Sequence, residues 1–266
     1  MQENSALGRA LDLVRDLRAR CPWDRVQTRS TLRPYLLEEV LELDEALASG
    51  DADRIREEVG DLLLHLAWQF VLAEESREFT PDDTADRLIA KMRRRHPHLF
   101  DLGPRESWET LKRRETARGV LDGLPATLPS LQMAYRLQQK AASVGFDWPD
   151  TVGPAAKVRE ELAEVEEELE RVMGDEGRAP EGADGGVERD AGDPLVEEIG
   201  DLLFAVVNLA RKARVQPTVA LDRANRKFRR RFTAIEALAA SRGVDVPTAG
   251  LEVLDGMWEE AKRRET

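Results

Sequence analysis

The sequence predicts an all-α protein built from two tandem helical repeats, each a helical bundle with its own carboxylate site. Three observations support this. Of the 266 residues, 35% are charged and only 5% are aromatic, a balance that favours helices over sheets. Apolar residues recur at spacings of three and four, as on one face of a helix. Pairs of acidic residues then recur in the same order in both halves of the chain.

Composition limits the classes of function. The net charge of -12 argues against a broad basic surface, so we expect no nucleic-acid partner. Cys21 is the only cysteine, which excludes an internal disulfide and a cysteine-based zinc site. The N-terminus lacks the layout of a signal peptide, and no stretch approaches the roughly 20 apolar residues of a membrane helix. We therefore expect a cytoplasmic protein without a membrane partner.

Four helices are predicted in the first half from apolar periodicity and from residues that start or stop helices. They span residues 7–20, residues from Pro34 to Ser49, residues from about Asp53 to Glu75, and residues from Thr80-Pro81 to His96-Pro97. The second helix is expected to bury Leu37, Val40, Leu41 and Leu47, and the third Ile55, Val59, Leu62, Leu63, Leu66 and Phe70.

The order of these signals recurs in the second half of the chain. The acids Glu39, Glu42, Glu58 and Asp61 reappear as Glu161, Glu164, Glu198 and Asp201. The first pair shifts by 122 positions and the second by 140. Lys91 and Arg95 match Lys227 and Arg231, and Trp108 and Lys112 match Trp258 and Lys262. Four ordered pairs indicate an internal duplication.

The two domains are expected to span residues 1–124 and 125–266, because a proline-containing connector at residues 124–129 separates them. The insert at residues 172–194 contains six glycines and no aromatic residue, so we interpret it as a mobile linker. It lies between the two acidic pairs of the second half. It could close over a ligand or simply be tolerated, since loop-closure entropy grows slowly with length.

The spacing of the acids suggests a metal site. Residues three apart lie on one face of a helix, so two such pairs on antiparallel helices would concentrate four negative charges. Mg²⁺ prefers oxygen ligands and could compensate them, with Mn²⁺ as an alternative. A single acidic pair is more often a solvated helix surface. Here the acidic pairs recur in the same register in both halves, which favours a metal site. A glycine, Gly60 or Gly200, lies between the Glu and the Asp of the later pair in each half. Close approach of the helices would account for both glycines.

These motifs resemble those of the MazG nucleoside triphosphate pyrophosphohydrolases, whose pattern is EExxE followed by ExxD. Further stretches that look like the two-domain bacterial members are Cys21-Pro22-Trp23-Asp24, Arg94-Arg95-His96-Pro97-His98, Gly145-Phe146-Asp147-Trp148 and Ala224-Asn225-x-Lys227-Phe228. The resemblance covers nearly the whole chain. It implies Mg²⁺-dependent hydrolysis of a nucleoside or deoxynucleoside triphosphate to the monophosphate and pyrophosphate, with broad base tolerance, by a homodimer.

The second half is the better candidate for the working site. Its Lys157 and Asn208 are matched in the first half by Tyr35 and Trp68, so the first half has lost a cation and a small polar group. In the family, too, catalysis is associated mainly with the C-terminal domain. We therefore assign catalysis and metal binding to Glu161, Glu164, Glu198 and Asp201. The first-half acids Glu39, Glu42, Glu58 and Asp61 form a second site that is vestigial, structural or separately active.

The resemblance also suggests residues that bind the substrate. Lys157, Lys227 and Arg231 would offer cations to the phosphates, and Trp258 would stack on the base, which suits weak base discrimination. Each has a structural alternative. Lys227 and Arg231 lie in a basic stretch that could be a surface face, and a tryptophan is more often a core or interface residue.

Three other functions compete with this one. An enzyme of the same superfamily could be specific for dUTP or phosphoribosyl-ATP, and a non-catalytic helical module could bind a nucleotide or a protein partner. An oxygen-activating di-metal bundle is disfavoured, because no Glu-x-x-His motif is present. The sequence does not separate removal of damaged nucleotides from a role in stress signalling.

Overall fold

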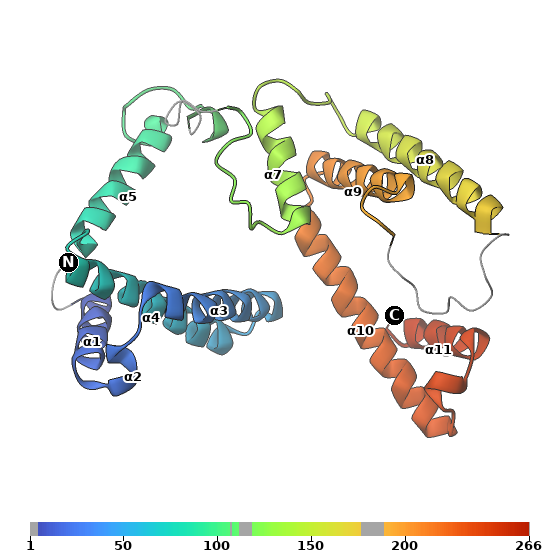
Figure 1. Ribbon diagram of the computed structural model, residues 1–266, viewed down its shortest axis with the longest axis horizontal. Helices are drawn as coiled ribbons and strands as arrows, with labels where there is room; N and C mark the ends of the chain where they lie inside the picture. The colour runs from blue at the N-terminus through green and yellow to red at the C-terminus, as the bar shows by residue number, and fades with distance from the viewer. Residues whose placement is uncertain (1–4, 107, 112–118, 177–188, 266) are drawn as a thin grey trace. The chain divides into compact units, whose positions relative to one another are not determined.

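The computed structural model describes residues 5–106, 108–111, 119–176 and 189–265. Within these ranges every regular element is a helix, which confirms the all-α prediction (Figure 1). The chain divides into two compact units, residues 1–106 and 107–266, and each is described by itself. No helix in the described ranges has both the length and the apolar character needed to cross a bilayer.

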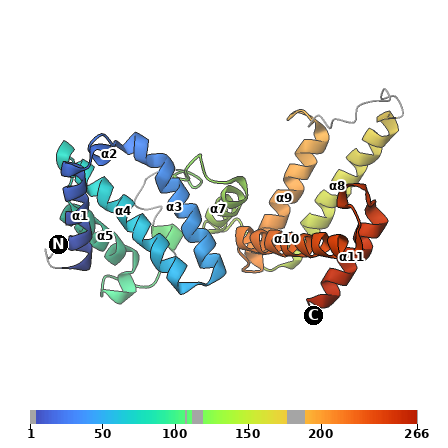
Figure 2. The ribbon, with the colours of Figure 1, turned by 90° about the horizontal axis from the view of Figure 1, so that it is seen from below.

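Each unit contains a pair of long helices packed against each other. The first unit consists of α1 (Ala6–Arg20), α2 (Pro22–Arg25), α3 (Arg29–Ser49), α4 (Ala52–Ser76), α5 (Pro81–Arg95) and the 3₁₀ helix η1 (Pro97–Leu99). The second consists of α7 (Ser130–Ala142), α8 (Val152–Glu176), α9 (Pro194–Lys212), α10 (Pro217–Arg242), the 3₁₀ helix η2 (Val246–Thr248) and α11 (Leu251–Arg264). The pairs are α3 with α4 and α8 with α9 (Figure 2).

The start of α3 differs from the prediction, because the helix begins at Arg29 and Pro34 lies inside it. A reciprocal cap sets this earlier start. The Thr28 hydroxyl oxygen accepts a hydrogen bond from the Thr31 backbone N–H at 3.2 Å, and the Thr31 hydroxyl oxygen accepts one from the Thr28 N–H at 2.8 Å. The extra turn carries Leu32 into the core, where only 1% of it is exposed.

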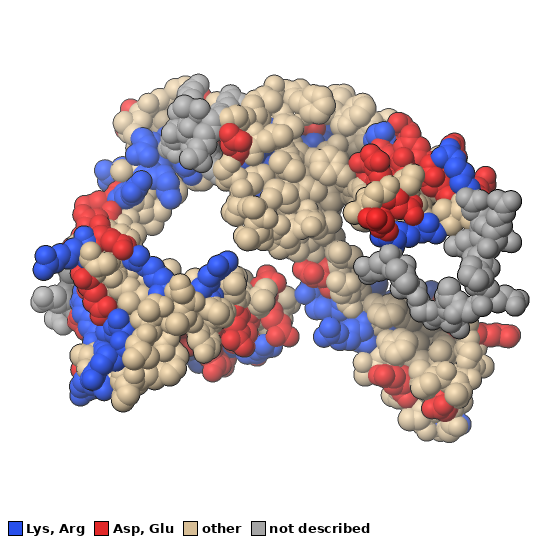
Figure 3. Space-filling model, viewed as in Figure 1, with Lys and Arg blue, Asp and Glu red and all other residues tan. Residues whose placement is uncertain are grey.

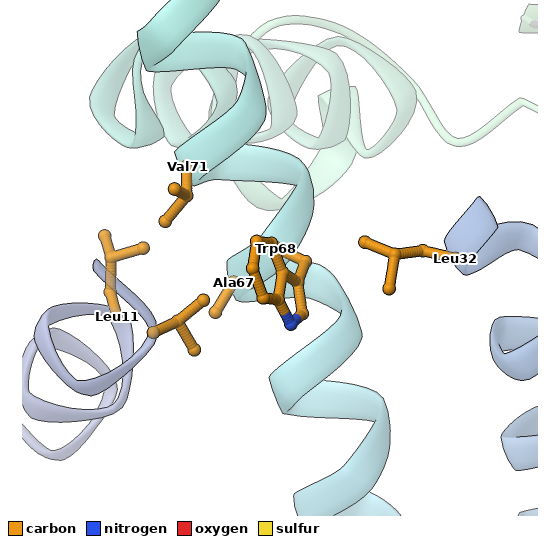
Figure 4. Packing of buried hydrophobic residues seen from close by; sticks show 6 residues of the cluster. Leu11, Leu32, Ala67, Trp68 and Val71 are labelled. Carbon is orange, nitrogen blue, oxygen red and sulfur yellow. The ribbon is translucent and has the colours of Figure 1, made fainter. Parts of the chain in front are cut away.

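The core of the first unit is centred on Trp68 of α4, of which 2% is exposed (Figure 4). Around it lie Leu11, Val14, Leu32, Ala67 and Val71. The predicted inward faces are therefore wrong at six positions, all exposed: Leu37, Val40, Leu41, Leu47, Val59 and Leu66. The reason is that α1 packs on the side of α4 that carries Trp68, so a second apolar stripe is left uncovered in this unit.

The second unit has its buried cluster between α10 and α11, formed by Ile235, Leu238, Ala239 and Met257. Helix α7 packs against α9 and α10. Helix α8 continues to Glu176, so the first residues of the predicted 172–194 linker are helical. Residues 177–188 of that linker, and Lys112 of the repeat, lie outside the described residues. The predicted division at residue 124 stays a prediction.

Replacing Trp68→Ala should lower the free energy of unfolding of the first unit by about 3–5 kcal/mol, because it empties the centre of the core. Urea unfolding of the full chain measures this. The control Leu99→Ala, at an exposed position of the same unit, should change the value by no more than about 0.5 kcal/mol. Equal effects of the two substitutions would contradict the packing described.

Candidate functional site

The carboxylates predicted in the second half converge on one pair of helices. Glu161 and Glu164 of α8 and Glu198 of α9 each offer a carboxylate oxygen, and these atoms lie within 4.8 Å of one another. Acidic side chains gather over α8 and α9 in Figure 3. Asp201 follows one turn after Glu198 and lies outside this group of three. The structure thus brings together three of the four predicted ligands.

Lys157 places an ammonium group against this cluster. The Lys157 Nζ lies 2.5 Å from a carboxylate oxygen of Glu161 and 2.7 Å from one of Glu160. The hydrogen bond from Lys157 lowers the pKa of Glu161, although that carboxylate is buried. The pKa of Glu164 is raised by its hydrogen bond to Glu161, by burial and by the charges of Glu161 and Glu198. Negative charge is therefore only partly compensated by Lys157.

The first unit has a matching group. Glu39 and Glu42 of α3 and Glu58 of α4 also place carboxylate oxygens within 4.8 Å of one another. Burial, followed by the charges of Asp61, Glu42 and Glu58, raises the pKa of Glu39, and burial with the charges of Glu42 and Asp61 raises that of Glu58. In place of a lysine this unit has Tyr35.

The side chain of Tyr35 packs edge-on against the ring of Trp23, with ring centroids 6.2 Å apart. The position that matches Lys157 therefore carries an aromatic contact instead of an ammonium group. The carboxylates of the first unit consequently lack the lysine that partly neutralises those of the second.

The glycines within the acidic motifs are not explained by close helix packing. A Cβ atom placed on Gly60 or Gly200 would meet nothing within 4 Å. The expectation that these positions need glycine for helix approach is therefore wrong. Each glycine instead leaves open space beside its carboxylate pair.

Two of the other predicted substrate-binding residues form a separate cluster on α10 and α11. Arg231 donates from Nε to a carboxylate oxygen of Glu265 at 2.8 Å, and its guanidinium lies 5.5 Å from the ring centroid of Trp258. The ring of Phe228 lies 5.4 Å from that of Trp258. Lys227 is exposed on α10, one turn before Arg231. Their roles toward a substrate stay predictions.

The second unit also contains a cavity that the sequence did not predict. It lies between α7, α9 and the loop that joins α7 to α8, and Gln138, Trp148 and Asn208 are among the residues that line it. Two signals in the sequence could have indicated it. Trp148 belongs to the Gly145-Phe146-Asp147-Trp148 stretch, and Asn208 stands where the first half has Trp68.

Fold and site together define a tandem all-α protein with a carboxylate cluster on each long helix pair. The model of the MazG nucleotide pyrophosphohydrolase domain matches residues 27–100 and 154–234, which contain both clusters. The chain therefore belongs to the MazG nucleotide pyrophosphohydrolase family, as the sequence motifs predicted.

Three relatives are similar to this chain over most of its length. A protein of Escherichia coli K12 named nucleoside triphosphate pyrophosphohydrolase is 38% identical over 264 residues, covering 95% of this chain and 94% of its own. One of Thermotoga maritima, named nucleoside triphosphate pyrophosphohydrolase/pyrophosphatase MazG, is 39% identical over 250 residues, covering 91% and 89%. The uncharacterized protein YabN of Bacillus subtilis is 38% identical, covering 95% of this chain and 51% of its own.

The ion pairs of Glu265 give a test of the α10–α11 cluster. Hydrogen bonds from Arg230 and Arg231 hold the pKa of Glu265 at about 2, below its ordinary value of 4.5. These bonds therefore stabilise the fold fully at a pH above 4.5, and their contribution is lost as the pH falls through about 2. Replacing Arg231→Gln should raise the pKa of Glu265 toward 4.5 in a carboxyl NMR titration. An unchanged pKa of Glu265 would contradict the pairing. The control is Arg226→Gln on the same helix, which should leave that pKa as it is.

Proposed function

We propose that this protein is a Mg²⁺-dependent nucleoside triphosphate pyrophosphohydrolase that cleaves between the α and β phosphates and tolerates several bases. The observation that carries the proposal is the convergence of Glu161, Glu164 and Glu198, with Lys157 in contact with Glu161. Membership of the family and the names of the two relatives that match along nearly their full length support it.

The carboxylate cluster fits a hard divalent cation. Its donors are all carboxylate oxygens, which Mg²⁺ prefers and Mn²⁺ also accepts. The hydrogen bond to Glu161, burial and then the charges of Glu161 and Glu198 raise the pKa of Glu164, and an added cation would relieve the repulsion among these carboxylates. Glu161, Glu164 and Glu198 would hold the ion, with Asp201 one turn away as a further oxygen donor. When bound, the ion would supply positive charge to offset that of the phosphates and would help to activate a water nucleophile.

The basic side chains would bind the triphosphate itself. Lys157 already lies at the edge of the carboxylates, so its ammonium group can exchange a contact with Glu160 for one with a phosphate oxygen. Lys227 and Arg231 are proposed as further phosphate ligands. For Arg231 this requires giving up its bond to Glu265, which adds to the cost of binding.

Incubation with each canonical triphosphate and Mg²⁺ should release pyrophosphate and the monophosphate, not orthophosphate. Replacing Glu198→Gln should lower kcat/KM about a hundredfold or more, because one ligand charge is lost while the shape is kept. The matched control Glu58→Gln, the same change in the first unit, should leave most activity. Orthophosphate release, or full activity of Glu198→Gln, would contradict the assignment.

The same assay separates the competing functions. Comparable kcat/KM for several bases supports broad tolerance, whereas turnover of a single triphosphate would identify a narrow-specificity enzyme. Triphosphate binding without release of pyrophosphate in Mg²⁺ would identify a non-catalytic module.

We also infer a homodimer, supported by an uncovered apolar face on the second helix pair. On α9, Ile199, Leu203 and Val206 are exposed at spacings of four and three, and on α8 Leu162 and Leu169 are exposed seven apart. Both patterns place the side chains in one stripe along the helix. A pair of helices with such stripes is half of a four-helix bundle, and a second copy would complete it.

Light scattering should give a mass of about twice 29.9 kDa for the native chain. Leu203→Glu should shift it to one chain at micromolar concentration, because a charge in the stripe opposes burial of the face. The control Val219→Glu, at an exposed position on α10, should leave the mass unchanged. A native chain of single mass would contradict the homodimer.

A further inference from the structure

The loop between α7 and α8 is held against the end of α9. The carboxylate of Asp147 accepts hydrogen bonds from Nη1 of Arg211 at 3.3 Å and from Nζ of Lys212 at 3.2 Å. Nζ of Lys212 also donates to the backbone carbonyl of Trp148 at 2.5 Å. The side chains of Arg211 and Lys212 are only 11% and 15% exposed, so these ion pairs are screened less than pairs on the open surface. The loop therefore has a defined place beside α9.

The same loop sets where α8 begins. The indole of Trp148 lies over Gly153 in the first turn of α8, and a Cβ atom on that glycine would come within 2.2 Å of the ring. Only a glycine therefore leaves room for the indole at this place. A chain of contacts thus runs from the end of α9 through the loop to the start of α8. We call it the loop anchor, and its members are Asp147, Trp148, Gly153, Arg211 and Lys212.

Within the chain, α8 has few other contacts that fix its position. Among the described residues, α9 is the one helix against which it packs extensively (Figure 2). Residues 177–193 separate the two helices along the chain, so no short turn joins them. Glu161 and Glu164 of α8 also repel Glu198 of α9. The position of α8 along α9 must therefore be held from elsewhere, against this repulsion.

The first unit holds its long helix pair in another way. Helix α3 ends at Ser49 and α4 begins at Ala52, so only Gly50 and Asp51 lie between them. Gly50 has a φ of 73°, and the Asp51 carboxylate accepts a hydrogen bond from the Asp53 N–H at 2.9 Å. This two-residue turn fixes the position of α3 along α4.

The two cations of the loop anchor have no counterpart at the matching positions of α4. Those positions, 140 residues earlier, are Val71 and Leu72. Val71 is buried in the apolar core, with 4% of it exposed. Arg211 and Lys212 thus occur in the unit whose long helices lack a short turn.

A shift at the start of α8 would reach the carboxylates. Gly153, Lys157 and Glu161 are spaced four apart and share one face of α8. Glu161 lies about 12 Å along the helix axis from Gly153, at 1.5 Å per residue. A helix moves as a rigid element over such a length, so a displaced first turn would move Glu161 relative to Glu198 of α9.

From these contacts we propose that the loop anchor positions the metal site of the second unit, which rests on the function proposed for that site. The anchor sets the place of α8 along α9 and thereby keeps Glu161 and Glu164 beside Glu198. Asp147 is its central positioning residue, because its carboxylate receives both cations. The anchor acts on the bound cation only through the positions of these carboxylates.

The substitution Asp147→Asn tests this, because it keeps the shape of the side chain and removes the charge that holds both cations. We expect Mn²⁺ affinity, measured by calorimetry without nucleotide, and kcat each to fall about tenfold or more, with a smaller change in KM. The control Asp255→Asn, at an exposed position on α11, should change neither. A lower melting temperature with native Mn²⁺ affinity in the folded variant would show a purely structural role and contradict the proposal.

A double-mutant cycle tests whether Asp147 acts through the anchor. Lys212→Met should lower Mn²⁺ affinity in the same direction. Adding Asp147→Asn to that variant should cause less further loss than Asp147→Asn causes alone, because the two side chains share one interaction. Full additivity of the two losses would contradict the coupling.

Spin labels measure the position of α8 without metal or turnover. They are attached at Glu170→Cys on α8 and Glu197→Cys on α9, both exposed, in a Cys21→Ser background. Diluting the labelled chain with unlabelled chain restricts the measured distance to one chain. The distance should be single in the otherwise native protein and should shift or broaden in Asp147→Asn and in Gly153→Ala. If Gly153→Ala does not fold, Asp147→Asn decides.

An unchanged label distance in folded Asp147→Asn protein would overturn the role of the loop anchor. Failure of the proposed function looks different. The native protein would then release no pyrophosphate from any triphosphate, while the change in label distance caused by Asp147→Asn would still be measured.

Discussion

Carboxylates on two neighbouring helices repel one another, and both units hold such a group together. Helices α8 and α9 hold Glu161, Glu164 and Glu198 within 4.8 Å of one another, where three like charges oppose the packing that brings them together. The ammonium group of Lys157 relieves only part of this repulsion, and the pKa of Glu164 remains raised. The divalent cation that we propose would relieve this repulsion in each unit.

Duplication makes the two units a comparison within one chain. Both keep three carboxylates with oxygen atoms within 4.8 Å of one another, yet the groups beside them have diverged. The first unit has Tyr35 packed on Trp23 and Trp68 at the centre of its core, whereas the second has Lys157 on its acids and a cavity beside Asn208. The first unit has gained apolar packing at the positions where the second retains a cation and an open pocket. This supports assigning catalysis to the second unit.

The sequence predicted the helices and the acidic clusters well, because periodicity and i, i+3 spacing are local properties. It was less accurate for features that depend on tertiary contacts, such as helix ends and buried faces. Pro34 looked like a helix start, but the Thr28–Thr31 cap starts the helix at Arg29, five residues earlier. Val59 and Leu66 were expected inside, yet α1 covers the side of α4 that carries Trp68. The cavity could not be predicted, since it depends on how Trp148 lies over Gly153 and how Lys212 anchors that loop.

The position of Mn²⁺ in crystals of the native protein, located by its anomalous scattering, would show whether these carboxylates hold a cation. We expect a peak between Glu161, Glu164 and Glu198, bound through carboxylate oxygens and absent from crystals of a Glu161→Gln, Glu198→Gln double variant. Strong Mn²⁺ peaks elsewhere, with these three carboxylates unliganded or turned away from one another, would contradict it.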